Sequence, residues 1–172
     1  FLSNIREVDA IVEVVRCFKD SNIIHVENSV DPIRDIEIIN LELIMADLQS
    51  IENRVSKIER KAMTNKDKDA LAELAVLNKI KEALEAGKAA RSVELNPEEL
   101  FIVKGFNLLT NKPMIYIGNV GEEDIANPEN NKYYQQLSEL AVKEGAEIVP
   151  ICAKVEEEIS TLDEEDRVMF FE

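Results

Sequence analysis

The segment MIYIGNVGE, residues 114–122, carries the clearest signal of the fold class. Four apolar or aromatic residues, Met114 to Ile117, form a short run that is typical of a buried strand. The run stops at Gly118-Asn119, so a buried strand leads directly into small and polar residues. In open parallel sheets, ligands bind beyond the carboxyl ends of the strands. We therefore expect a strand here and a candidate site just after it.

Two further strands and their helices surround this segment in the sequence. Residues 10–18 (AIVEVVRCF) are apolar and β-branched, which predicts a strand with near-continuous burial. Residues 147–152 (EIVPIC) predict a third strand, and amphipathic helices are expected over 130–145 and 155–170. Residues 1–8 have the pattern of the end of a helix. Strands that alternate with helices predict an α/β fold with a parallel sheet.

A long helical segment separates the first strand from the second. Asp31-Pro32 predicts its start, and a polar break at 64–67 divides it from a second helix over 68–86. The pair predicts an antiparallel coiled-coil hairpin, which either protrudes or folds back onto a globular core. The narrow seam and the charged outer positions favour a protruding hairpin. The apolar residues that step by three and four along the first helix are Leu41, Ile44, Leu48, Ile51, Val55, Ile58 and Ala62.

Composition excludes several classes of protein. The chain has 172 residues and a net charge of −15. This charge argues against binding of DNA, and against binding of any phosphate backbone along the whole surface of the protein. No apolar run reaches the roughly 18 residues of a membrane span, so no membrane partner is expected. Two cysteines, Cys17 and Cys152, do not make a disulfide framework, and a reducing cytoplasmic setting is the default expectation.

One basic cluster interrupts this acidic chain. Between Arg54 and Lys68, six Lys or Arg residues face two acidic ones, a local charge of +4 at the predicted hairpin tip. Such a run is commonly a solvated helix face, and the alternative is a contact with RNA or an acidic partner. The candidate contact residues are Lys57, Arg60, Lys61, Lys66 and Lys68.

The expected strand ends carry the candidate binding residues. The Asn119 amide offers an acceptor and a donor to the edge of a purine, although Asn at a strand end often serves a turn. Cys152-Ala153 leaves room and backbone N–H groups for a base, and Phe18 offers an apolar or stacking face. His25 is the only histidine, and no metal-ligand spacing occurs, so we expect no metal ligand and no catalytic residue.

Three segments together resemble the YchF family of Obg-like ATPases. They are FLSNIREVDAIVEVVRCF (1–18), HVENSVDPIRDIEIINLELIMADL (25–48) and NLLTNKPMIYIGNVGEED (107–124), and the run from Val30 to Glu37 is the most specific. The resemblance implies a P-loop GTPase-like G domain that is interrupted by a helical coiled-coil insert and followed by a TGS domain. On this basis the partial G domain comprises 1–30 and 105–172, and the helical coiled-coil insert comprises 31–104.

The resemblance also implies ATP hydrolysis with ATP preferred over GTP. The guanine-reading motif NKxD of GTPases is replaced in the family by NxxE, which here is Asn119-Val120-Gly121-Glu122. The Asp of NKxD accepts from N1–H and the exocyclic amine of guanine, and adenine lacks both donors in that arrangement. The implied nucleotide-binding residues are Phe18, Asn119, the backbone at Val120, Glu122, Cys152 and Ala153.

The family's phosphate-binding parts have no counterpart in this sequence. The P-loop, switch I and DxxG segments are expected before Phe1, and the TGS domain after Glu172. The Mg²⁺ ligands are then expected in the missing N-terminal segment, and the chain alone is expected to be inactive. The resemblance implies a link to the ribosome, translation or stress responses. The alternative is a non-catalytic coiled-coil interaction module that binds a protein or RNA partner.

Overall fold

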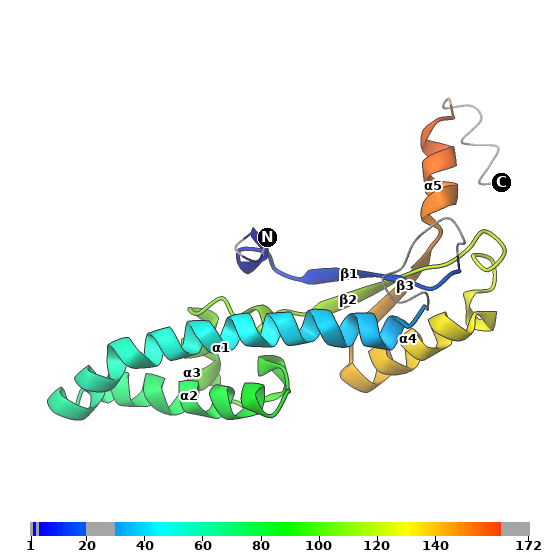
Figure 1. The fold of residues 1–172 in the computed structure, drawn as a ribbon. Helices are drawn as coiled ribbons and strands as arrows, with labels where there is room; N and C mark the ends of the chain where they lie inside the picture. The colour runs from blue at the N-terminus through cyan, green and yellow to red at the C-terminus, as the bar shows by residue number, and fades with distance from the viewer. Residues whose placement is uncertain (1, 3, 20–29, 163–172) are drawn as a thin grey trace. The chain divides into compact units, whose positions relative to one another are not determined.

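The computed structural model describes residues 2, 4–19 and 30–162 (Figure 1). The chain forms two compact units. The first contains residues 1–11 and 37–113 and is mostly helical, and the second contains 12–36 and 114–172. The ranges expected for the G domain and its insert remain a prediction. No helix among the described residues combines the length and the hydropathy that a membrane span requires.

The described residues form one sheet of three strands, β1 (Ile11–Arg16), β2 (Met114–Asn119) and β3 (Glu147–Ile151), in the order β1-β2-β3. β2 and β3 are parallel, with Asn119 opposite Ile151. β1 also runs parallel to β2, because the Ile11 N–H donates to the Pro113 carbonyl at 2.9 Å and the Cys17 N–H donates to the Asn119 carbonyl at 2.8 Å. The predicted α/β class is confirmed, and the three carboxyl ends share one edge of the sheet.

Two predictions for the N-terminal residues are wrong. β1 is not buried almost continuously: its side chains alternate, with Val12 and Val14 exposed and Glu13 and Val15 buried. This is the period-two pattern of a strand with only one covered face. The expected helix over 1–8 is only a 3-10 turn at Asn4–Arg6 among the described residues, because so short a segment makes too few hydrogen bonds to sustain a helix.

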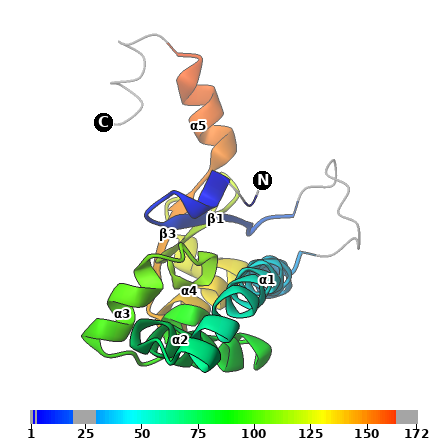
Figure 2. The same ribbon diagram turned by 90° about the vertical axis from the view of Figure 1, so that its left-hand side faces the viewer.

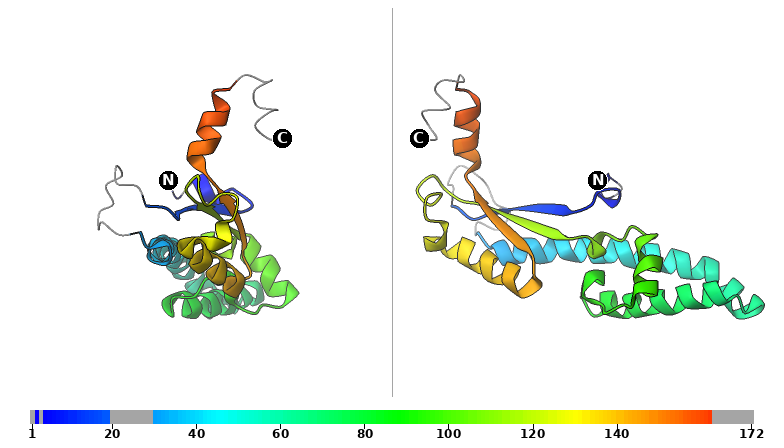
Figure 3. Two further views of the ribbon diagram at one scale, coloured as in Figure 1. Left: turned by 90° about the vertical axis from the view of Figure 1, so that its right-hand side faces the viewer. Right: turned by 180° about the vertical axis from the view of Figure 1, so that it is seen from behind.

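In the second unit, α4 (Lys132–Glu144) packs on β2 and β3 (Figure 3). The approach is so close that a Cβ on Gly118 would lie 2.7 Å from the ring of Tyr134, so only glycine fits there. Gly145, with φ +67°, ends α4 in the left-handed conformation. α5 (Ala153–Ser160) starts and ends earlier than expected, and 163–172 lie outside the described residues.

Three helices form the first unit: α1 (Pro32–Asn65), whose first turn belongs to the second unit, α2 (Lys68–Glu85) and α3 (Pro97–Lys104). The predicted break is confirmed, since Asp67 caps α2 by accepting from the N–H groups of Asp69 and Ala70. α1 and α2 are antiparallel and lie side by side (Figures 1 and 2). Ion pairs join them, from Arg54 to Glu73 and from Lys61 to Asp67.

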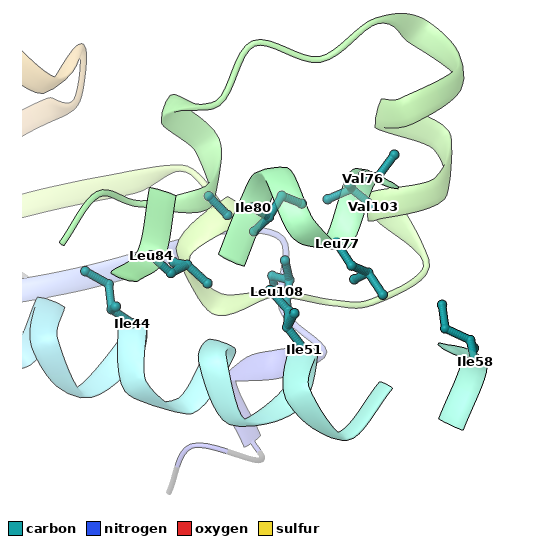
Figure 4. Close-up of a cluster of buried hydrophobic side chains, with 10 residues drawn as sticks. Ile44, Ile51, Ile58, Val76, Leu77, Ile80, Leu84, Val103 and Leu108 are labelled. Atoms are coloured by element: carbon teal, nitrogen blue, oxygen red, sulfur yellow. The ribbon is translucent and has the colours of Figure 1, made fainter. Parts of the chain in front are cut away.

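The core of this unit lies between α1 and α2 (Figure 4). One predicted seam position is wrong, because the Leu41 side chain is 56% exposed. Val103 of α3 and Leu108 complete the core, so the two helices share it with later segments of the chain. The protruding hairpin remains a prediction. The seam side chains that meet in the core are Ile44, Ile51 and Ile58 of α1 and Val76, Leu77, Ile80 and Leu84 of α2.

A buried carboxylate fixes α1 to the segment that precedes β2. Asp47 is fully buried and accepts from the Leu109 N–H at 2.9 Å, the Thr110 N–H at 2.8 Å and the Thr110 hydroxyl at 2.7 Å. The Arg6 guanidinium lies 3.8 Å away. The Thr110 hydroxyl oxygen in turn accepts from the Ala90 N–H at 3.0 Å.

The short 3-10 helices of the chain's later part are Ala90–Ser92, Leu109–Asn111 and Pro128–Asn130.

Candidate functional site

A pocket of about 450 Å³ lies in the second unit, at the carboxyl ends of the three strands. Its lining comes from 17–19 after β1, 119–124 after β2, 152–154 after β3, and Asn131 and Tyr133 at the start of α4. The structure brings together all six residues that the sequence singled out for nucleotide binding. They are Phe18, Asn119, Val120, Glu122, Cys152 and Ala153.

The two ends of the Asn119 amide have different surroundings. Its Oδ1 accepts a hydrogen bond from the Ala153 N–H at 3.0 Å, which ties the end of β2 to the start of α5. Its Nδ2 makes no hydrogen bond within the described ranges. The amide therefore holds a loop with its oxygen, while its N–H donors have no partner among the described residues. The expectation that the Ala153 N–H is open to a base is wrong, because Asn119 already uses it.

Val120 and Cys152 form the buried wall of the pocket. The Val120 N–H donates to the Ile151 carbonyl at 2.8 Å, so this N–H belongs to the sheet and is not open to a ligand. The Cys152 side chain is buried, and its carbonyl accepts from the Glu156 N–H in the first turn of α5. Cys17 is also buried, and burial raises the pKa of its thiol to about 12, so this thiol stays protonated and unreactive.

Phe18 is half-buried at the rim and is held by Arg16. The Arg16 guanidinium lies 5.1 Å from the centroid of the Phe18 ring, and the Arg16 Nε–H donates to the Phe18 carbonyl at 3.0 Å. Arginine stacked on an aromatic ring is a favourable cation–π arrangement. The contacts with Arg16 thereby hold the ring at the pocket.

The charged groups of the pocket include one ion pair between its loops. Lys154 Nζ lies 3.0 Å from Glu122 Oε1, with 70% of the lysine side chain and 47% of the glutamate side chain exposed. The hydrogen bond with Glu122 is the main cause that raises the pKa of Lys154. Lys19, Glu123 and Asp124 also line the pocket.

Asn131 is a functional-site residue that sequence reasoning missed. It is 8% exposed, and its Nδ2 donates to the Cys17 carbonyl and to Asp124 Oδ2, both at 2.8 Å. Its Oδ1 accepts from the N–H groups of Tyr133 and Tyr134 and so caps α4. The Asn131 side chain thus joins three segments: the carboxyl end of β1, the loop after β2, and the first turn of α4. The sequence predicted a helix over 130–145 that includes Asn131, so the cap was not predicted, and no local signal pointed to the two distant partners.

The sequence predicted no metal ligand and a basic cluster at the hairpin tip. Among the described residues, no group of three or more His, Cys, Asp or Glu side chains is placed to hold a metal ion, and His25 lies outside them. In the basic cluster, Lys61 and Arg54 pair with Asp67 and Glu73 between the helices. The exposed cations of the cluster that form no ion pair in the described part of the chain are Lys57, Arg60, Lys66 and Lys68.

Comparison with known proteins gives a consistent result, although no family model matches the chain. All 172 residues align at 49% identity with the Ribosome-binding ATPase YchF of Bacillus subtilis (strain 168), and at 47% with that of Escherichia coli O157:H7. The chain is therefore similar to YchF proteins over its whole length. It spans about half of these YchF relatives, 47% and 46% of their respective lengths.

The fold agrees with a solved YchF structure. The Schizosaccharomyces pombe YchF GTPase superposes with a TM-score of 0.84 at 32% sequence identity, over 98% of this chain and 46% of that protein. The resemblance inferred from the three sequence segments is therefore confirmed, and so is the parallel α/β fold that it implied.

Proposed function

We propose that the pocket at the carboxyl ends of β1, β2 and β3 binds the purine base of ATP in a nucleotide-hydrolysing, GTPase-like protein. The observation that carries this proposal is the Asn119 amide, whose oxygen is fixed by the Ala153 N–H while its donors stay unused in the described ranges. The names of the relatives, a ribosome-binding ATPase and a YchF GTPase, support hydrolysis of a nucleotide.

The dimensions and the chemistry of the pocket suit a nucleobase. A volume of about 450 Å³ falls within the range of about 300–1,000 Å³ of small-molecule sites. A free amide donor on Asn119 complements N7, which is an acceptor in both adenine and guanine. Asn119 therefore selects a purine, and the proposed preference for ATP over GTP requires a second group.

The chain supplies base recognition and not the phosphate chemistry. Its five glycines are scattered at positions 87, 105, 118, 121 and 145, so no glycine-rich phosphate cradle is present. Bound Mg²⁺ would neutralise charge on the phosphates during transfer of a phosphoryl group to water. We assign its ligands to a segment outside this chain and expect no ATP hydrolysis by the 172 residues alone.

The test is a calorimetric titration of the intact protein with ATP and with GTP. Loss of one hydrogen bond to the base predicts that Asn119→Ala weakens both affinities about tenfold. Asn78→Ala, an exposed asparagine on α2, is the matched control and is expected to leave both affinities unchanged. Unchanged ATP affinity in Asn119→Ala contradicts the role given to this amide.

A second function is favoured by the cations at the end of the helix pair. We propose that they contact the ribosome, because they are exposed and form no ion pair among the described residues, and because the bacterial relatives are named ribosome-binding. Lys61 is better assigned to the hairpin itself, since it pairs with Asp67 at 3.2 Å. The alternative, a non-catalytic module that binds a protein or RNA partner, depends on the same surface.

Charge reversal separates a specific contact from general electrostatics. The triple variant Lys57→Glu, Arg60→Glu and Lys66→Glu is expected to lose co-sedimentation with ribosomes, most clearly at low salt. The control reverses three exposed lysines elsewhere, Lys88, Lys104 and Lys143, and so changes net charge equally. Equal binding by the two triple variants would exclude a specific role for the tip.

A further inference from the structure

The ion pair between Glu122 and Lys154 has no role in the pocket assigned so far. Glu122 is the acidic residue of NxxE, and Lys154 directly follows Ala153, whose N–H is bound to Asn119. The pair joins the loop after β2 to the first turn of α5, with Nζ and Oε1 3.0 Å apart. The hydrogen bond with Glu122 is also the main cause that raises the pKa of Lys154.

The chemistry of the two purines makes this carboxylate decisive. Guanine presents N1–H and an exocyclic amine as adjacent donors, which suit a free carboxylate acceptor. Adenine has an unprotonated N1 at the same place, which is itself an acceptor, so adenine gains no hydrogen bond there from a free carboxylate. Since N7 is common to both bases, Asn119 does not separate them, and discrimination depends on whether the Glu122 carboxylate is free.

We propose that Lys154 is a specificity-determining residue: its ammonium group holds the Glu122 carboxylate and withholds it from guanine. The inference rests on the proposed binding of a purine nucleotide in this pocket. A guanine that uses Glu122 must first displace Lys154, whereas adenine binds with the pair intact. Asp124, another carboxylate of the pocket, is bound to the Asn131 amide at 2.8 Å. The contact of 3.0 Å between Nζ and Oε1 identifies Glu122 as the carboxylate that Lys154 controls.

The experiment measures the dissociation constants of ATP and GTP for the intact protein and for Lys154→Met. Because exposed ion pairs contribute up to about 1 kcal/mol, freeing Glu122 is expected to shift the ratio of the two constants about fivefold toward GTP. Lys19→Met is the matched control, since Lys19 lines the same pocket and has no ion pair within the described residues. It removes the same charge and is expected to leave the ratio unchanged.

A double-mutant cycle tests whether Lys154 acts through Glu122. In Glu122→Gln, which has no carboxylate to free, adding Lys154→Met is expected to leave the ATP-to-GTP ratio unchanged. The proposal is overturned if both nucleotides bind but Lys154→Met keeps the original ratio, or if Lys19→Met shifts the ratio as much. If the unaltered protein binds neither nucleotide, the proposed function itself fails, which is a distinguishable result.

Discussion

The two units each bury a carboxylate, and they do so in opposite ways. Asp47 in the helical unit is 0% exposed and accepts three hydrogen bonds from Leu109 and Thr110. Glu13 on β1 is 5% exposed, and neither of its oxygens has a hydrogen-bond partner in the described part of the chain. Burial, followed by repulsion from Glu144 and Asp35, raises its pKa to about 7. The buried carboxylate of Asp47 is therefore expected to stabilise its unit through hydrogen bonds, whereas ionisation of the Glu13 carboxyl is expected to destabilise the other unit near neutral pH.

Removing the hydrogen-bonded carboxylate of Asp47 is expected to lower the free energy of unfolding more than any of the other substitutions. Asp47→Ala leaves two backbone N–H groups and a hydroxyl of 109–110 buried without an acceptor, which predicts a loss on the order of 4 kcal/mol in the free energy of unfolding. Urea denaturation measures the loss. Glu59→Ala, at an exposed position of α1, is the control and should change stability by less than about 0.5 kcal/mol. Similar values for the two variants would contradict the anchoring role of Asp47.

Two asparagines that cap helices, one in each unit, also differ in how many distant groups they bind. Asn131 caps α4 and also binds Cys17 and Asp124, whereas the exposed Asn96 only caps α3 through a capping box with Glu99. Asn131→Ala is expected to cost about 2–3 kcal/mol and Asn96→Ala about 1 kcal/mol. Thermal unfolding of both variants gives the difference. If Asn96→Ala proves the costlier change, the tertiary bonds of Asn131 contribute nothing.

Replacing the unpaired Glu13 carboxylate is expected to raise the free energy of unfolding by an amount that depends on pH. The pKa of Glu13 rises from 4.5 to about 7 on folding, so between these values the unfolded chain loses a proton that the folded chain keeps. Stability contributed by this group is therefore full below pH 4.5, falls as pH rises, and is lost above about pH 7. Glu13→Gln removes this loss, and the variant should be more stable than the parent by about 2 kcal/mol above that window.

Denaturation curves across the same window test this prediction. The stability difference between Glu13→Gln and the parent should grow with pH. Glu37→Gln, an exposed glutamate on α1, is the control and should give a small difference that does not change with pH. A constant difference for Glu13→Gln would show that its carboxyl titrates alike in the folded and unfolded chains.

The smallest effect is expected from the surface ion pair between Arg54 and Glu73. The pair joins α1 to α2, but nearly half of the Arg54 side chain is exposed. Arg54→Ala should cost only about 0.5 kcal/mol, and less at high salt. Chemical denaturation at two salt concentrations measures this cost, with Lys88→Ala as the control, because Lys88 is exposed and forms no ion pair within the described residues. A salt-independent cost would indicate lost packing of the arginine stem instead of lost charge.

The features that the sequence predicted well depend on local signals. The break at 64–67 and the end of β2 at Asn119 both follow from residue types within a few positions. The pocket could be predicted because parallel strands place their carboxyl ends at one edge, which brings Phe18 and Cys152 to Asn119. Neither the element boundaries nor the pocket position requires knowledge of which side chains face inward.

The features that the sequence could not predict depend on distant partners. Glu13 faces inward because the pairing of β1 with β2 fixes which alternate residues are covered, and that register is not encoded in the apolar run itself. Asn131 binds Cys17, which lies 114 positions earlier. The exposure of Leu41 likewise depends on where the partner helix ends, because a heptad pattern does not show how far its seam is covered.

Photolabelling with an azidoadenosine triphosphate, with the azide at carbon 8 beside N7, locates the base in the intact protein. Purine binding in the pocket predicts labelled peptides that contain 17–19, 119–124 or 152–154, and labelling that excess ATP suppresses. Asn119→Ala should reduce the labelling of these peptides. Label confined to other peptides, or label at these peptides that excess ATP does not suppress, would contradict purine binding at the ends of the three strands.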